Sequence, residues 1–205
     1  MKINKSLGVC IGASTVSAVF LKKQNNSVTV ESHITTPHHG NPGDILNKIF
    51  SGNIPEKAAV TGKKFRNFLN LTSISEAEAV ELASGFLNLS ADLIISAGGE
   101  NFIVYSPGKD NKIARVYTGN KCASGTGEFF LQQIRRMDLN TPEAVSLGSK
   151  GDPYNISGRC SVFCKSDCTH ALNKGVPREN VVAGLSRMMA RKITELVPED
   201  RKQRV

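Results

Sequence analysis

The sequence of 205 residues contains no tryptophan, and aromatic residues make up only 6% of it. Proteins that bind single-stranded nucleic acid stack bases on aromatic side chains, so this scarcity argues against that function. The chain also lacks a run of the roughly 18–20 apolar residues that a membrane-spanning helix needs, which excludes an integral membrane protein. The segment from Met1 to Ser6 has no apolar stretch typical of a secretory signal, so we expect a cytoplasmic protein.

Acidic residues are too few to balance the basic ones, and the formal net charge is +8. Residues 101–205 carry +7 of this charge and residues 1–100 carry +1. A basic half can bind nucleic acid, an acidic partner, or an anionic ligand such as a nucleotide or an iron–sulfur cluster. A solvated basic surface explains the same charge. Binding to duplex nucleic acid would predict an affinity that falls steeply with salt.

Cysteines are also few, and their number and spacing make a poor disulfide framework. There are five, and three of them are crowded into the segment from Cys160 to Cys168. Clustered cysteines in a reducing compartment more often serve metals or redox chemistry. Cys160, Cys164 and Cys168 are four apart, so they share one face of a regular helix. We interpret Cys10, Cys164 and Cys168 as small buried apolar residues, with extra metal or redox ligands as the alternative.

A pattern of strand, glycine turn and strand occurs twice. It begins at Leu7–Ile11 and again at Leu93–Ala97, and helical patterns follow the second copy at 125–137, 161–173 and 178–196. We predict an α/β protein with two related lobes, residues 1–92 and 93–197, and a loose charged tail at 198–205. Each lobe is expected to combine a β-meander with helices.

Local signals predict two helix starts and one loop in the first lobe. Asp44 is expected to cap a helix that runs through Phe50. Ser75 and Glu78 fit a capping box that opens a helix to about residue 87. His38 and His39 lie in a loop rich in proline and glycine, where we favour a solvated pair over a metal site.

Two glycine turns are candidate phosphate-binding sites. A tight turn of small residues exposes backbone N–H groups to an anion, which phosphate oxygens require, although either turn alone also suits an ordinary hairpin. Glu100 or Asn101 can position water or a metal-bound water. The candidate residues are Gly12, Ala13, Ser14 and Thr15 in the first turn (residues 8–15), and Gly98, Gly99, Glu100 and Asn101 in the second (residues 96–101).

Two cysteines stand at predicted helix starts. Cys122 and Cys160 each come just before a helix, where the helix dipole and backbone N–H groups favour a thiolate. Two thiolates are half of the set that a [4Fe–4S] cluster takes, and a two-fold dimer would supply the other half. Lys121 and Arg159 precede these cysteines and can screen cluster charge, although simple surface residues are an equal alternative.

These stretches together resemble the BadF/BadG/BcrA/BcrD ATPase family, which includes activators of 2-hydroxyacyl-CoA dehydratases and ATPase subunits of benzoyl-CoA reductases. The resemblance runs from Leu7 to Leu196 through GVCIGAST, SAGGEN, NKCASGTGEFF, GRCSVFCKSD and NKGVPRENVVAGL. It implies the two-lobed, ribonuclease H-like fold of sugar kinases, heat-shock ATPases and actin. It also implies a homodimer that holds one [4Fe–4S] cluster through Cys122 and Cys160 of each subunit, and cofactor binding by Gly125, Thr126 and Gly127.

The function implied by the resemblance is that of an activator, an ATPase coupled to electron transfer. Such a protein takes an electron from ferredoxin or flavodoxin, and ATP with Mg²⁺ drives it into an acyl-CoA dehydratase or reductase by a hinge transition. A carbohydrate or carboxylate kinase of the same superfamily would share the phosphate turns. That alternative does not account for the two cysteine segments.

Three positions depart from the family pattern. Cys10 stands where the family usually has aspartate, Ser17 where it has lysine, and Glu100-Asn101 where it has Gln-Asp. Losing carboxylates weakens a Mg²⁺–phosphate site, so the alternative is a degenerate nucleotide-binding or docking domain that keeps the dimer and the cluster without hydrolysing ATP. The family's late Gly-Gly segment, which holds adenosine, is expected after the last helix, so we expect one unit of a longer protein.

Overall fold

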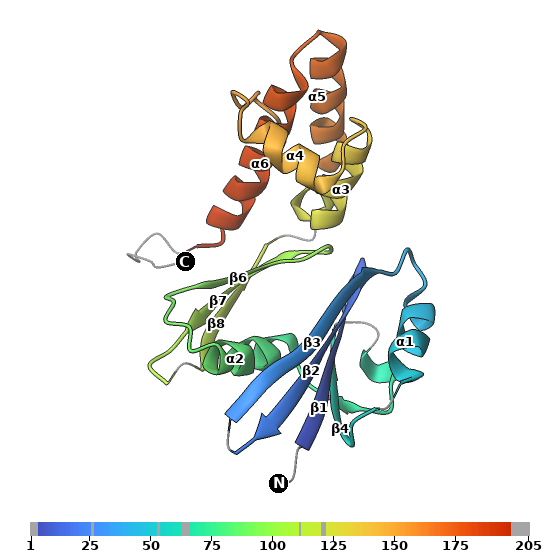
Figure 1. The fold of residues 1–205 in the computed structure, drawn as a ribbon. Helices are drawn as coiled ribbons and strands as arrows, with labels where there is room; N and C mark the ends of the chain where they lie inside the picture. Colours follow the sequence, from blue (N-terminus) through green and yellow to red (C-terminus); the bar gives the residue numbers. More distant parts are fainter. Residues whose placement is uncertain are drawn as a thin grey trace. The chain divides into compact units, whose positions relative to one another are not determined.

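A computed structural model describes residues 4–25, 27–52, 54–62, 66–110, 112–119 and 122–197. Lys121 and the tail at 198–205 therefore lie outside the described residues. The chain divides into two compact units, residues 1–89 and 90–205, and each is considered by itself (Figure 1). Across the ranges described, no helix combines the length and the apolar character needed to cross a membrane.

The first unit is built on a five-stranded sheet of order β3–β2–β1–β4–β5. The antiparallel meander continues into parallel pairs of β1 with β4 and of β4 with β5, so the carboxyl ends of these three strands share one edge. Alternate residues of β1 face a core that includes Leu7, Val9 and Val60. The strands are β1 (Asn4–Ile11), β2 (Thr15–Gln24), β3 (Ser27–Pro37), β4 (Lys57–Thr61) and β5 (Thr72–Ser73).

The helices of the first unit are α1 (Pro42–Phe50), the short 3₁₀ helix η1 (Arg66–Phe68) and α2 (Glu76–Phe86). The prediction that Asp44 caps α1 is wrong, because the helix begins at Pro42 with Asn41 as its N-cap. Proline suits the first turn, since its missing N–H has no partner there anyway. Asp44 instead accepts a hydrogen bond of 2.8 Å from the Asn41 side chain. Ser75 caps α2 as predicted and accepts a 3.1 Å hydrogen bond from the Glu78 N–H.

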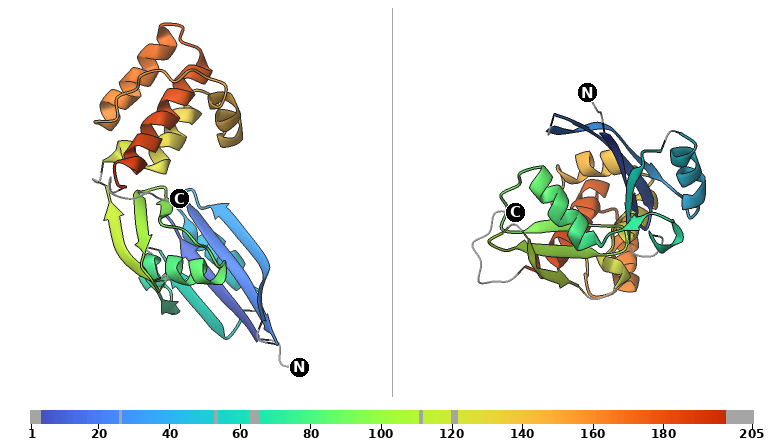
Figure 2. Two further views of the ribbon diagram at one scale, coloured as in Figure 1. Left: turned by 90° about the vertical axis from the view of Figure 1, so that its left-hand side faces the viewer. Right: turned by 90° about the horizontal axis from the view of Figure 1, so that it is seen from below.

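The second unit joins a three-stranded antiparallel sheet, of order β6–β7–β8, to a group of helices (Figure 2). Its core surrounds α6, whose apolar residues between Val181 and Met189 are buried. Cys164 and Cys168 are buried in this core, which agrees with their interpretation as small apolar residues. The elements are β6 (Ile94–Ala97), β7 (Phe102–Pro107), β8 (Ile113–Thr118), η2 (Ala123–Gly125), α3 (Gly127–Arg135), α4 (Thr141–Gly148), α5 (Ser161–Asn173) and α6 (Arg178–Thr194).

The duplicated pattern in the sequence is a duplicated turn in the structure. The Gly12 N–H donates to the Thr15 carbonyl at 2.9 Å, and the Gly98 N–H donates to the Asn101 carbonyl at 3.0 Å. In each unit this turn joins the first two strands of a meander. The two candidate phosphate turns therefore have the same backbone hydrogen bond in the same structural position.

Candidate functional site

The first turn is held by a buried histidine, whereas the sequence predicts a solvated one. The Nε2 atom of His38 lies 3.2 Å from the Gly12 carbonyl oxygen, and the Gly40 N–H donates to Nδ1 at 3.0 Å. Because Nδ1 accepts, Nε2 carries the proton and donates to Gly12. The expectation of a solvated His38 is wrong, since only 7% of the residue is exposed, and the hydrogen bonds replace water. His39 is exposed.

The end of β1 carries the Cys10 thiol at the position where the resemblance leads us to expect aspartate. Cys10 is exposed, so the prediction that it is a buried apolar residue is wrong. Cys10 pairs in register with Thr61 of β4, so both side chains point to the same face of the sheet. Desolvation and, to a lesser extent, the Glu76 carboxylate raise the pKa of the Cys10 thiol. Cys10 is therefore an uncharged group at neutral pH.

Magnesium favours oxygen ligands, and the residues at this edge of the first sheet offer some. Thr61 has a buried Oγ1 that finds no hydrogen-bond partner within the described residues, and Glu76 adds a carboxylate. The described residues hold no group of three or more His, Cys, Asp or Glu side chains placed to bind a metal ion. The donors therefore fit a Mg²⁺ ion held partly by nucleotide phosphates and water rather than by a full protein cage.

The second turn packs directly on the start of α3. The Gly127 N–H donates to the Gly98 carbonyl and the Glu128 N–H to the Gly99 carbonyl, both at 3.0 Å. A Cβ atom at position 127 would lie 2.9 Å from the Gly98 oxygen, so only glycine fits there without movement. Thr126 caps the helix by accepting a 3.1 Å hydrogen bond from the Phe129 N–H. The first N–H groups of α3 therefore hold the turn in place, and Gly127 is required for its close approach.

The two predicted cysteine ligands are brought to the same helix end. Cys122 is the N-cap residue of η2 and Cys160 is the N-cap residue of α5. The Cys122 sulfur lies 3.9 Å from the carbonyl oxygen of Arg159, the residue before Cys160. The Ser124 hydroxyl lies 3.1 Å from the Cys122 sulfur and 3.3 Å from the Gly158 carbonyl, so it joins the two loops.

The surroundings of Cys122 stabilise its thiolate form. Hydrogen bonds from the Ser124 hydroxyl and backbone, the charge of Lys192 and a hydrogen bond from the Ser161 backbone lower the pKa of the Cys122 thiol. Ser161 is the first residue of α5, so the Cys122 sulfur lies at the positive end of that helix. This is the environment that favours metal-binding or reactive cysteines.

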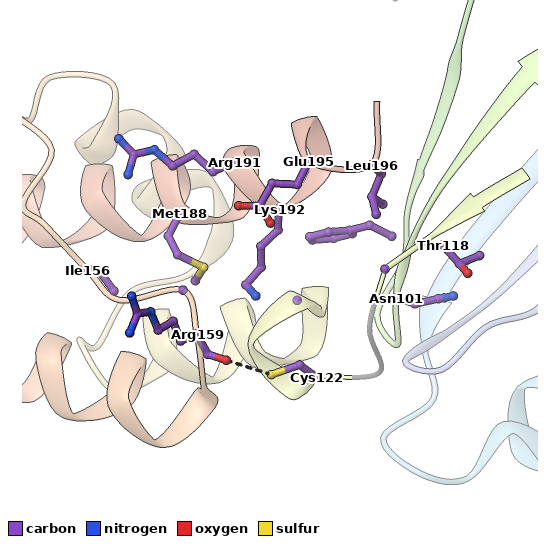
Figure 3. A pocket seen from close by; sticks show the side chains of 14 residues that line it. Asn101, Thr118, Cys122, Ile156, Arg159, Met188, Arg191, Lys192, Glu195 and Leu196 are labelled. Carbon is purple, nitrogen blue, oxygen red and sulfur yellow. Dashed lines mark hydrogen bonds between the residues drawn. The ribbon is translucent and has the colours of Figure 1, made fainter. Parts of the chain in front are cut away.

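A cavity of about 630 Å³ in the second unit adjoins Cys122 (Figure 3). Three basic residues, Arg159, Arg191 and Lys192, line it together with one acidic residue, Glu195. Asn101 of the second turn also lines it. The Lys192 side chain extends from α6 toward the start of η2 (Figure 3). A site with this charge suits an anionic group, such as a phosphate or an iron–sulfur cluster.

The structure therefore brings some predicted residues together and not others. Asn101, Cys122 and Gly125 line the cavity. Cys160 does not line it, but it is the N-cap of α5 and directly follows Arg159, whose carbonyl oxygen lies 3.9 Å from the Cys122 sulfur. The remaining candidates of the second unit do not line it, namely Gly98, Gly99, Glu100, Thr126 and Gly127. Gly12, Ala13, Ser14 and Thr15 form the first turn and belong to the first unit. The roles of all these residues stay predictions.

Three residues that shape the site were not predicted from the sequence. Nothing in the sequence indicated that Lys192 belongs to the site, because a lysine near the end of an amphipathic helix is typical of a solvated surface. Gly62 follows β4 with φ of +122°, and a Cβ atom there would collide with the Ile11 backbone. The position of Gly62 directly after a short strand could have indicated this role, since glycines at such positions often allow two backbone segments to approach closely. His38, as described above, gave no periodic signal of burial.

The donor set of one chain fits half of a [4Fe–4S] site. Two cysteine thiols lie at one helix N-terminus with a lysine nearby, which matches the ligand type and the negative charge of such a cluster. One chain offers two of the four thiolates in this segment, because Cys164 and Cys168 are buried in the core. A complete ligand set therefore needs a second copy or another donor.

Comparison with known proteins identifies relatives across nearly the whole chain. The model of the BadF/BadG/BcrA/BcrD ATPase family matches residues 7–202. The 2-hydroxyisocaproyl-CoA dehydratase activator of Clostridioides difficile is 26% identical over 94% of this chain and 75% of that protein. The activator of lactoyl-CoA dehydratase of Anaerotignum propionicum is 28% identical over 88% of this chain and 72% of that protein.

Solved structures agree on the fold. The activator of the 2-hydroxyisocaproyl-CoA dehydratase from Clostridium difficile with bound ADPNP aligns with a TM-score of 0.84 and 24% identity, covering 94% of this chain and 75% of that one. Component A of the Acidaminococcus fermentans (R)-2-hydroxyglutaryl-CoA dehydratase gives 0.81 and 20%, covering 94% and 77%. At these identities the likeness shows the fold, and the predicted actin-like ATPase fold is confirmed.

Proposed function

The chain belongs to the BadF/BadG/BcrA/BcrD ATPase family, and from this premise we propose that it is an ATP-dependent activator of a 2-hydroxyacyl-CoA dehydratase or a related CoA-ester reductase. Relatives named as dehydratase activators support the class of partner. The observation that carries the proposal is that Cys122 and Cys160, far apart in sequence, share the N-terminus of α5.

In this proposal Cys122 and Cys160 are the two thiolate ligands that each subunit of a homodimer gives to one [4Fe–4S] cluster. When bound, such a cluster carries one electron at low potential. The Ser161 N–H and the Lys192 ammonium group hold negative charge at the Cys122 sulfur. Ferredoxin or flavodoxin is the proposed electron source, and the acyl-CoA enzyme is the proposed acceptor.

The nucleotide half of the proposal rests on the two equivalent turns. ATP with Mg²⁺ is the proposed ligand. The backbone N–H groups of residues 13–15 in the first turn and of Gly99 in the second are its proposed phosphate contacts, because the N–H groups of Gly12 and Gly98 are bonded within their own turns. Asn101 and Glu100 are the proposed water-positioning residues of the second unit. Gly125 and Thr126 are further proposed contacts, while the Gly127 N–H is already bonded to Gly98.

The cluster is tested by iron and acid-labile sulfide analysis of anaerobically purified protein. We expect about four of each per dimer, and we expect Cys122→Ala and Cys160→Ala each to lose them. Cys168→Ala, which removes a buried thiol from the same helix as Cys160, is the matched control and should keep its iron. Unchanged iron in both ligand variants would refute the assignment.

The ATPase is tested on the same anaerobic protein by phosphate release with and without the Gly98→Val change. A side chain there would approach the Asn101 carbonyl, since a Cβ atom would already lie 3.3 Å from it. We expect hydrolysis that the change abolishes. A dimer that holds its cluster but does not hydrolyse ATP would favour the degenerate docking domain instead.

A further inference from the structure

The first glycine of each candidate phosphate turn has its carbonyl bonded to a donor from outside the turn. In an ordinary four-residue turn this carbonyl accepts from the N–H of the fourth residue. In the first turn the Gly12 carbonyl instead lies 3.2 Å from the His38 Nε2 atom, and within the described residues the Thr15 N–H does not bond to it. In the second turn the Gly98 carbonyl accepts from the Gly127 N–H at 3.0 Å. The same carbonyl is therefore held from outside in both units.

The external bond decides where the neighbouring N–H groups point. A peptide unit is planar and trans, so its carbonyl and the N–H of the next residue point in opposite directions. Because the Gly12 carbonyl points at His38, the Ala13 N–H points away from it. The His38 backbone N–H also donates to the Ser14 carbonyl at 3.0 Å, so the Thr15 N–H points away as well. His38 thus holds two peptide units by their carbonyls and turns their N–H groups to the opposite side.

The loop that carries His38 closes on itself and fixes the imidazole in one position and one tautomer. The Gly40 N–H donates to Nδ1 at 3.0 Å, which leaves the proton on Nε2. The Asn41 N–H donates to the His38 carbonyl at 2.7 Å, and Asn41 is also the N-cap of α1. Gly40 has φ of +88°, which glycine adopts without strain. The buried imidazole is therefore a rigid support for the first turn.

We propose that His38 is a positioning residue of the ATP site, which holds the first turn so that the Ala13 and Thr15 N–H groups meet phosphate oxygens of the nucleotide. This role rests on the proposed ATPase function and names how one of its contacts is built. In the second unit the start of α3 does the same work through Gly127. A side chain in one unit and a helix end in the other hold the same carbonyl, which supports a requirement for the orientation of the turn.

The test removes the donor that reaches Gly12 and then restores it. A glutamine side chain places an amide N–H at about the reach of Nε2, whereas asparagine is one methylene shorter. We expect His38→Asn to raise the Kd of the complete, anaerobically prepared protein for a non-hydrolysable ATP analogue with Mg²⁺. The expected increase is about 10–100-fold, the effect of losing one hydrogen bond to a charged group. We expect His38→Gln to restore most of the affinity, with Kd measured by calorimetry.

His39→Asn is the matched control for these variants. His39 is the next residue of the same loop, and it is exposed. Its φ of +47° lies in the left-handed region, which asparagine tolerates better than most residues. We therefore expect His39→Asn to fold normally and to keep the original Kd. Urea denaturation of every variant separates a loss of affinity from a loss of the fold.

A second measurement follows the first turn directly. Hydrogen–deuterium exchange, read by mass spectrometry on peptides that span residues 12–16, should slow when the ATP analogue is added at a concentration that saturates each protein. We expect this protection in the unmodified protein and in His39→Asn. We expect less protection in His38→Asn, because its N–H groups are no longer held toward the phosphates. Full protection in saturated His38→Asn would overturn the proposed orientation.

Failure of this role for His38 is distinguishable from failure of the proposed function. Unmodified protein that does not bind the analogue overturns both. Unmodified protein that binds it, with folded His38→Asn within twofold of the same Kd, overturns the role of His38 and leaves the nucleotide site in place. Equal losses in His38→Asn and His38→Gln also overturn that role, because the loss would not come from the missing donor. If His38→Asn does not fold, His38→Gln decides, since a folded variant that binds weakly overturns the role and one that binds normally supports it.

Discussion

Cys122 and Cys10 are both accessible thiols whose surroundings move their pKa values in opposite directions. Hydrogen bonds from Ser124 and the charge of Lys192 lower the pKa at Cys122, while desolvation and Glu76 raise it at Cys10. At neutral pH the thiolate fraction is therefore larger at Cys122. In cluster-free protein, iodoacetamide at pH 7 should label Cys122 several-fold faster than Cys10, as followed by peptide mass spectrometry.

The control for this prediction is the same labelling in denaturant, where both thiols are solvated and should react at similar rates. Raising the pH should narrow the difference in the folded protein, because the thiolate fraction at Cys122 saturates first. Equal rates at pH 7 in the folded protein would contradict the electrostatic environment described at the start of α5.

Gly62 allows the backbone after β4 to pack closely against Ile11, at the edge of the first sheet that carries Cys10 and Thr61. Its φ of +122° lies where side chains are strained, and a Cβ atom there would collide with the backbone of Ile11. Gly62→Ala should therefore lower the free energy of unfolding by about 2–4 kcal/mol in urea denaturation. Gly8→Ala is the control, because a Cβ atom on Gly8 meets nothing within 4 Å, and it should cost far less.

Single residues were predictable from sequence where local chemistry decided their role. The place of Cys122 and Cys160 at helix starts could be recognised because the beginning of each helix is visible in the sequence, and both are N-cap residues. Their role as cluster ligands stays a prediction. The burial of His38 could not be recognised, because it depends on the Gly12 carbonyl, which is 26 residues away in the chain. A Pro/Gly-rich segment carries no periodic pattern from which such a long-range hydrogen bond could be inferred.

At the scale of elements, the start of α3 and the second turn are held together by two backbone hydrogen bonds, from Gly127 to Gly98 and from Glu128 to Gly99. Gly127→Ala should push the helix start from the turn, because the new Cβ atom would lie 2.9 Å from the Gly98 carbonyl oxygen. We expect a loss of about 1–3 kcal/mol in the free energy of unfolding, measured by urea denaturation, since overpacked contacts cost energy of this order. Gly125→Ala is the control, because its Cβ atom would meet Lys192 at an ordinary 3.5 Å. Equal losses in both variants would contradict a specific role for the turn–helix contact.

Element boundaries were predictable where capping was local. The predicted bounds of α5 agree with Ser161–Asn173, and α4 begins at Thr141 after an Asn140–Glu143 capping box. The helix predicted over 125–137 is instead a short 3₁₀ turn followed by α3, because Thr126 has extended dihedrals and caps the second piece. Small and hydroxyl residues allow either a continuous helix or a break at Thr126, so the sequence did not predict the break. In the structure the Gly127 N–H, just after it, is bonded to the Gly98 carbonyl of the second turn.

At the scale of the whole molecule, a single chain cannot supply all the thiolate ligands of the proposed cluster. Cys122 and Cys160 provide two thiolates, and the other cysteines described are buried in the core or belong to the first unit. A two-fold axis through the cluster would bring the start of α5 close to its copy. Val162 and Phe163, which follow Cys160 in the first turn of α5, are 68% and 62% exposed, so they are apolar surface available for that contact.

This arrangement predicts that iron content and dimerisation are lost together. Phe163→Ser should leave the monomer folded, because the Phe163 side chain is mostly exposed and contributes little to the hydrophobic core. It should nevertheless weaken the dimer and lower the iron content per chain. Val145→Ser is the matched control, since Val145 is 64% exposed on α4, a different helix from the one that carries Cys160. Sedimentation velocity with iron analysis separates the outcomes. A Phe163→Ser protein that remains a fully loaded dimer would move the proposed two-fold axis away from α5, whereas a loss of both properties in that variant alone would support it.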